Sequence, residues 1–178
     1  INLIQGQDYQ LSHRLVQHPD IKAVGFTGSE RVGMILQKLA WQREEPIPFF
    51  GELGSVNPQF LLPQQLKAHS DALADMLVGS LTLSQGQMCT NPGIWFALEG
   101  DALNAFKHHL ALKLSDVPAT HMLTLAIGDN YCSQVHALQQ AGNTQQIASG
   151  QPGKPHETQS FVFEVSGQAF AETPELQQ

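Results

Sequence analysis

The sequence predicts an α/β fold, with helices and short strands alternating along the chain. Residues 8–41 give the clearest indication, because they contain a helical run, a short apolar run, a glycine turn and a second helical run in that order. Further short apolar or alternating runs recur between runs of helical spacing, as in an α/β sheet flanked by helices. With 178 residues and a hydrophobic content of 42%, the chain can bury a sizeable core.

Helices are predicted where apolar residues recur at helical spacing. Asp8 is a plausible N-cap of the first, which ends before Pro19, and Ser29 stands at the head of the second. The predicted helices cover residues 8–18, 30–41, 64–84, 101–114 and 131–141. In the third, the residues expected on the buried side are Leu66, Leu73, Met76, Leu77, Val78 and Leu81.

Strands are predicted in the shorter apolar or alternating runs between these helices. They cover residues 22–26, 49–50, 56–62, 94–98, 144–148 and 160–165. Residues 149–158 are rich in Gly, Pro and polar side chains, and therefore predict an exposed loop.

Composition excludes several classes of function. The formal net charge of −7 and the absence of a basic stripe argue against nucleic acid or an anionic membrane surface as a partner. No apolar run approaches the roughly 18 residues that cross a bilayer. Two cysteines in a chain of this size favour reduced thiols and a cytoplasmic location over a disulfide framework. The histidines show no metal-ligand spacing, so no metal site is expected.

The stretch from Gly86 to Gly93 places Cys89 in a glycine-rich turn after the third predicted helix. A thiol presented on a tight turn is well suited to act as a nucleophile. The alternative is an inert buried thiol, a common fate of free cysteine. Cys132 has no such setting and is interpreted as structural.

Two other turns carry chemistry. Glu52 lies between Gly51 and Gly54, where the flexible backbone permits close approach of a ligand, although a solvated loop glutamate is the simpler alternative. Ser29 follows Gly28 at the start of a predicted helix, where unpaired N–H groups and the helix dipole favour a phosphate. A plain N-cap role for Ser29 remains open on this evidence.

Taken together and in order, three stretches resemble the aldehyde dehydrogenase superfamily. They are residues 26–29 (FTGS), 51–58 (GELGSVNP) and 86–90 (GQMCT), with 23 residues from Ser29 to Glu52 and 37 from Glu52 to Cys89. The fuller runs at 46–58 and 89–93 are similar to the branch of 2-oxoglutarate semialdehyde dehydrogenases and NADP-preferring bacterial fatty aldehyde dehydrogenases.

The resemblance implies NAD(P)-dependent oxidation of an aldehyde, with Cys89 as the nucleophile and Glu52 as the general base. It implies that Ser29 contacts the cofactor pyrophosphate and that Gly28 keeps that turn open for the cofactor. It also implies that Val32 packs near the adenine and that Leu53 lies by the nicotinamide through its backbone. NADP is slightly favoured over NAD. Residues 1–48 would be the end of a Rossmann-like cofactor domain, and residues 49–178 an incomplete catalytic domain with an open parallel sheet.

The resemblance also implies that the chain is an internal fragment, inactive alone, of an enzyme that forms homo-oligomers. Two alternatives remain open. One is a cofactor-independent cysteine esterase or thioesterase, which would need a histidine base near Cys89. The other is a non-catalytic truncated remnant.

Overall fold

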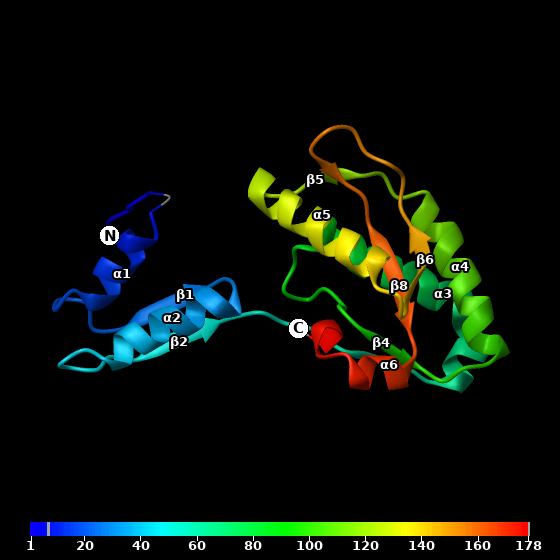
Figure 1. Cartoon of the computed structure of the whole chain (residues 1–178), viewed down its shortest axis with the longest axis horizontal. Helices are drawn as coiled ribbons and strands as arrows, with labels where there is room; N and C mark the ends of the chain where they lie inside the picture. Colours follow the sequence, from blue (N-terminus) through cyan, green and yellow to red (C-terminus); the bar gives the residue numbers. More distant parts are fainter. Residues whose placement is uncertain (7, 178) are drawn as a thin grey trace. The chain divides into compact units, whose positions relative to one another are not determined.

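Helices and short strands alternate through the computed structural model, which describes residues 1–6 and 8–177. The chain divides into two units, Ile1–Ser55 and Val56–Gln178. Figure 1 shows the elements of each unit. The predicted functional boundary at residue 48 stays a prediction, because the two units describe packing and not cofactor binding.

The first unit contains α1 (Tyr9–Gln17), β1 (Val24–Thr27), α2 (Glu30–Trp41) and β2 (Phe49–Glu52). The predicted N-caps are both found, since Asp8 accepts a hydrogen bond from the Gln10 N–H at 2.9 Å and Ser29 from the Val32 N–H at 3.4 Å. Strands β1 and β2 pair in parallel, with Thr27 opposite Glu52.

A small buried cluster holds this unit together. It consists of Val16, Leu36, Ala40 and Ile47. Arg43 donates hydrogen bonds from Nη1 to the carbonyls of Val16 and Ile21, at 3.0 and 2.9 Å. The guanidinium thus satisfies carbonyls around the end of α1, where a helix leaves acceptors unpaired.

The second unit holds the remaining elements. They are β3 (Gln59–Leu61), α3 (Pro63–Thr82), the 3₁₀ turn η1 (Leu83–Gly86), β4 (Trp95–Ala97), α4 (Asp101–Ser115), β5 (Thr120–His121), α5 (Leu125–Gln140), β6 (Thr144–Ser149), β7 (Glu157–Thr158), β8 (Phe161–Val165), α6 (Gly167–Glu172) and the 3₁₀ turn η2 (Pro174–Gln177). Helix α3 packs along α4, and the largest fully buried side chains of the unit are Leu66, Phe106, Leu110 and Leu114.

Strands pair in twos. β3 and β4 are parallel, as expected for strands joined by a helical crossover through α3. β6 pairs antiparallel with β8, and β5 pairs antiparallel with β7. The expected parallel pairing is therefore found at β1–β2 and β3–β4, whereas β5–β7 and β6–β8 are antiparallel. The connection from β6 to β8 contains no helix, so the chain reverses direction between these two strands.

Three details of the sequence prediction were wrong. Met76 is 60% exposed, because the buried face of α3 runs through Ala74, Leu77 and Val78 and helical periodicity places Met76 beside that face. Helix α5 begins at Leu125 instead of 131, capped by Thr124, whose hydroxyl accepts from the Ile127 N–H at 3.2 Å. The predicted loop at 149–158 contains β7, which the pattern missed because only two residues pair.

No helix among the described residues has the length and apolar character needed to cross a bilayer.

Candidate active site

Cys89 is exposed in a β-turn that follows α3 and η1. The Asn91 N–H donates to the Met88 carbonyl at 3.0 Å and closes this turn. The chain reaches it through three successive residues of positive φ: Ser84 (51°), Gln85 (56°) and Gly86 (74°). A left-handed conformation costs a non-glycine residue roughly 1–2 kcal/mol, so surrounding contacts must hold this segment.

Gln85 provides one such contact. The residue is only 9% exposed, and its Nε2 donates to the Thr158 carbonyl at 2.5 Å. Its Oε1 accepts from the Thr120 hydroxyl at 2.9 Å. The segment leading to Cys89 is therefore fixed to β5 and β7.

Asn57 holds the turn itself. Its Nδ2 donates to the Cys89 carbonyl at 2.7 Å and to the Asn91 carbonyl at 3.0 Å. Asn57 has φ of 48°, a left-handed conformation that asparagine tolerates better than most residues. Next to it, the Gly93 N–H donates to the Val56 carbonyl at 2.8 Å and extends the β3–β4 pairing toward the turn.

Asn91 completes the set of amides. Its Nδ2 donates to the Leu81 carbonyl at 2.9 Å, near the end of α3. Three side-chain amides (Asn57, Gln85 and Asn91) therefore fix the turn that carries Cys89 to α3, the β3 end of the sheet and the β5–β7 pair.

Glu52 is the last residue of β2 in the first unit, and its side chain is exposed. Its carbonyl accepts a hydrogen bond from the Gly28 N–H at 3.1 Å. The backbone thus joins the candidate base directly to the glycine turn before α2. Cys89 belongs to the second unit.

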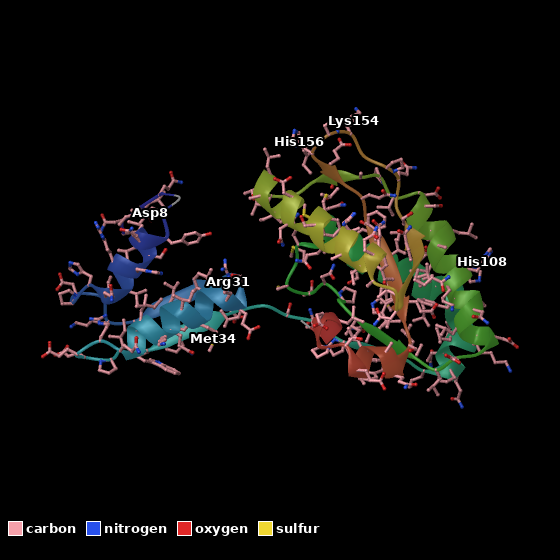
Figure 2. All side chains as sticks on the ribbon, in the orientation of Figure 1. Asp8, Arg31, Met34, His108, Lys154 and His156 are labelled. Atoms are coloured by element: carbon pink, nitrogen blue, oxygen red, sulfur yellow. The ribbon has the colours of Figure 1, made fainter. Side chains whose placement is uncertain are left out.

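The start of α2 has features that suit a phosphate. A twelve-residue helix begins here, Ser29 caps it, and the exposed Arg31 lies in its first turn (Figure 2). A Cβ at Gly28 would lie 2.7 Å from the Phe26 ring, so the turn keeps its backbone bare. Glu30 is the one acidic residue in this first turn, and it partly offsets Arg31.

The other two predicted cofactor residues, Val32 and Leu53, make contacts within the first unit. Val32 is half-buried and packs against the buried cluster of that unit. The Leu53 side chain lies directly over Gly33 of α2, so closely that a Cβ at Gly33 would collide with it. Leu53 therefore contacts α2, and the neighbouring Glu52 is hydrogen-bonded to Gly28 in the turn before that helix.

Sequence reasoning missed the positioning amides. Asn57 lies in the motif at residues 51–58, but no role was predicted for it. No role was predicted for Gln85 or Asn91 either. The local feature that could have indicated Asn57 is its position as a polar residue directly before Pro58.

A groove of about 580 Å³ adjoins the segment that leads to Cys89. Gln85, Gln87 and His121 line it, and Gln87 accepts from the Leu123 N–H at 2.9 Å. Among the described residues, no three His, Cys, Asp or Glu side chains form a group that could hold a metal ion.

The profile of the aldehyde dehydrogenase family matches residues 1–154. The chain belongs to the aldehyde dehydrogenase family. It is 38% identical to alpha-ketoglutaric semialdehyde dehydrogenase 2 of Azospirillum brasilense over 97% of the chain and 33% of that protein. It is 35% identical to an alpha-ketoglutaric semialdehyde dehydrogenase of Acinetobacter baylyi over 92% of the chain and 31% of that protein. The chain thus spans about a third of the length of these relatives.

Solved structures agree on the fold of this aldehyde dehydrogenase chain. A mutant of proline utilization A from Bradyrhizobium japonicum superposes with a TM-score of 0.79 at 19% identity, covering 91% of this chain and 17% of that one. A salicylaldehyde dehydrogenase from Pseudomonas putida superposes with a TM-score of 0.72 at 18% identity, covering 89% and 34%. The predicted fold class and family resemblance are confirmed.

Proposed function

We propose that this chain supplies the nucleophile and the general base for NAD(P)-dependent oxidation of an aldehyde to a carboxylic acid. The observation that carries the proposal is the exposed Cys89 on a turn whose carbonyls Asn57 holds, in a chain of the aldehyde dehydrogenase family. Because the chain spans about a third of the length of its relatives, we assign the reaction to a protein that contains this chain and not to these 178 residues alone.

In this proposal the Cys89 thiolate adds to the aldehyde carbonyl carbon and forms a tetrahedral thiohemiacetal. The backbone N–H of Cys89 donates to the oxyanion. The orientation of the turn therefore determines where this N–H points during the reaction. A nicotinamide cofactor, when bound by the turn and helix that precede Glu52, would supply the acceptor for the hydride of that carbon. The product on the protein is a thioester of Cys89.

Glu52 then acts on water. Its carboxylate takes a proton as water adds to the thioester carbonyl, the C–S bond breaks, and the acid leaves with the thiolate restored. The exposed position of Glu52 at the end of a strand leaves room for that water.

The cofactor is assigned to the turn and helix that precede Glu52. Gly28, Ser29 and the start of α2 hold its pyrophosphate, Val32 lies near the adenine, and Leu53 lies near the nicotinamide through its backbone. NADP is favoured slightly over NAD by the branch of the family that the sequence resembles.

For the substrate, we propose a semialdehyde that carries a carboxylate, such as 2-oxoglutarate semialdehyde. The two relatives that match nearly the whole chain are named as dehydrogenases of that compound. A long-chain aldehyde is the second candidate, because a long-chain-aldehyde dehydrogenase of an Acinetobacter species is 31% identical over 52% of the chain.

The test is reduction of NAD⁺ and NADP⁺ by a protein that contains this chain, with 2-oxoglutarate semialdehyde and a long-chain aldehyde compared. The absorbance of the reduced nicotinamide is followed for the parent protein, for Cys89→Ser and for Cys132→Ser. We expect loss of turnover only in Cys89→Ser. Unchanged turnover in that variant would overturn the assignment of Cys89.

We further propose that the 178 residues alone do not turn over aldehyde and that the longer protein is a homo-oligomer. The chain covers 33% and 31% of the two relatives described above, so about two thirds of their length has no counterpart in these 178 residues. Production of reduced nicotinamide by the purified 178-residue chain would contradict the first statement, and a monomeric longer protein in light scattering the second.

A further inference from the structure

The amide of Asn57 has both of its hydrogens committed to the turn that carries Cys89. Nδ2 donates to the carbonyl of Cys89 at 2.7 Å and to that of Asn91 at 3.0 Å. These two carbonyls flank the corner of the turn that the Asn91 N–H closes onto Met88. A single side chain therefore fixes two peptide planes around the thiol.

The orientation of a peptide plane determines where its neighbours point. The Cys89 carbonyl is part of the plane that follows the Cys89 Cα, so its fixed direction restricts the ψ of that residue. The position of Sγ relative to the Cys89 N–H then follows from φ, ψ and one side-chain rotamer. Acyl chemistry requires both groups, because Sγ attacks the carbon whose oxygen the N–H stabilises.

The backbone at Asn57 also indicates a specialised position. Its φ of 48° is left-handed, and the adjacent Val56 carbonyl accepts from Gly93 on the far side of the turn. The segment 56–57 is therefore attached to the Cys89 turn through both its backbone and its side chain. It follows Glu52 by only a few residues, so one short stretch leads from the candidate base to the support of the nucleophile.

We propose that Asn57 is a positioning residue that sets the geometry of Cys89 for attack on a carbonyl. This inference rests on the proposed role of Cys89 as the nucleophile. Asn57 touches neither substrate nor cofactor in this account. Its effect passes through the Cys89 and Asn91 carbonyls.

Two thiol reactions separate geometry from simple accessibility. Alkylation by iodoacetamide forms an S–C bond and releases iodide, and it requires only an exposed thiolate. Acylation by p-nitrophenyl acetate requires Sγ to add to the ester carbonyl, after which the ester C–O bond breaks and p-nitrophenolate leaves, while the thiol proton passes to water. Only the second reaction benefits from an N–H aimed at the developing oxyanion.

The experiment measures both rates on the 178-residue chain by mass spectrometry of the Cys89 and Cys132 peptides. Both cysteines are exposed, so Cys132 is an internal reference for accessibility and reagent concentration. The measured quantity is the ratio of acylation to alkylation at each cysteine. We expect a higher ratio at Cys89 than at Cys132 in the parent chain.

Two variants remove the clamp in different ways. Asn57→Asp keeps the shape and tolerates the left-handed backbone but loses both donors, whereas Asn57→Gly removes the side chain and accepts φ of 48° without strain. We expect both to lower the ratio at Cys89 about threefold to tenfold, the loss that one net hydrogen bond or slightly more produces. The Cys132 ratio stays unchanged.

Asn143→Asp is the matched control. Asn143 is an exposed asparagine whose Nδ2 donates to the Thr173 hydroxyl at 2.9 Å, and the substitution makes the same change of charge away from the turn. We expect the parent ratio at Cys89 in this variant. Circular dichroism identifies a variant that does not fold, and Asn57→Gly then decides if Asn57→Asp is lost.

An unchanged ratio at Cys89 in the folded Asn57 variants would overturn the proposal, as would equal ratios at Cys89 and Cys132 in the parent chain. Equal loss of acylation and alkylation at both cysteines would indicate a purely structural role and would also overturn it. Failure of the proposed function gives a different result, which is aldehyde oxidation that survives Cys89→Ser.

Discussion

The Gly28 N–H donates a hydrogen bond to the Glu52 carbonyl at 3.1 Å, at the point where β1 ends opposite β2. A backbone hydrogen bond therefore places Glu52, at the end of β2, next to the glycine turn before α2. Parallel pairing produces this, because the carboxyl ends of β1 and β2 lie at the same edge. Ligands of α/β sheets bind at such an edge.

Glu52→Gln is expected to slow hydrolysis of the thioester while leaving its formation intact. General base catalysis contributes roughly 10²–10⁴-fold, so steady-state turnover of the longer protein falls by a factor in that range. Rapid mixing with aldehyde and NAD(P)⁺ measures this. We expect one rapid equivalent of reduced nicotinamide followed by a slow phase.

Loss of the rapid phase in Glu52→Gln would place Glu52 before hydride transfer and contradict its role as the hydrolytic base. Glu45→Gln is a suitable control, because Glu45 is an exposed carboxylate in the same unit that forms an ion pair with Lys22 at 3.8 Å. It should behave as the parent protein.

Gly33→Ala is expected to destabilise the first unit. The added methyl group would collide with a terminal methyl group of Leu53, which must rotate away. Overpacking costs about 1–3 kcal/mol, and the roughly 0.5–1 kcal/mol that Ala gains over Gly inside a helix offsets part of it. Urea unfolding followed by Trp41 fluorescence reports on this unit, since Trp41 ends α2 and the other tryptophan, Trp95, can be replaced by Phe.

Gly79→Ala is the matched control for that prediction. Gly79 lies inside α3 with nothing within 4 Å of a built Cβ, so the same substitution should stabilise the second unit by about 0.5–1 kcal/mol. Trp95 fluorescence in a Trp41→Phe background follows it. Equal effects of the two substitutions would contradict the contact between Leu53 and Gly33.

Gln85→Leu is expected to destabilise the second unit by about 1–3 kcal/mol. The buried Thr158 carbonyl and the Thr120 hydroxyl would lose their amide partner, and leaving such groups unsatisfied carries this cost. Gln87→Leu is the comparison, because Gln87 is exposed and water can replace its hydrogen bonds. A larger loss of unfolding free energy in Gln87→Leu would contradict the buried role of Gln85.

Tyr131 is expected to make stability fall at high pH. Burial raises the pKa of its phenol to about 12, the charge of the neighbouring Cys132 adds to this, and the backbone of Phe161 opposes it. The hydroxyl donates to the Gln159 carbonyl at 2.8 Å, which only the protonated form can do.

The fold therefore favours the neutral phenol. Its contribution is complete below the unfolded pKa of about 10 and is lost as the pH rises through about 12, a change on the order of 2 kcal/mol. The difference in unfolding free energy between the parent and Tyr131→Phe should narrow over that range. A constant difference would show that Tyr131 ionises equally in both states.

Local signals predicted much of the fold. Asp8 and Ser29 were recognised as helix starts because a cap acts on N–H groups two or three residues away, and the structure confirms both. The order of strands and helices from β1 to α4 also followed from periodicity. The family resemblance rested on residues 26–29, 51–58 and 86–90, and the comparisons confirm the family.

The features that were missed depend on contacts between distant residues. Gln85 is fixed by Thr120 and Thr158, which lie 35 and 73 residues further along the chain, and no local pattern reports on them. Asn57 reaches Cys89 across 32 residues for the same reason. Strand β7 exists only through its pairing with β5.

The central claim is that Cys89 carries the acyl group during aldehyde oxidation. The most direct measurement is mass spectrometry of peptides from the longer protein bearing Glu52→Gln, quenched after mixing with 2-oxoglutarate semialdehyde and NADP⁺. The account predicts an acyl adduct on the Cys89 peptide, absent without the cofactor, with Cys132 unmodified. An adduct-free Cys89 in a sample that has formed reduced nicotinamide would contradict it.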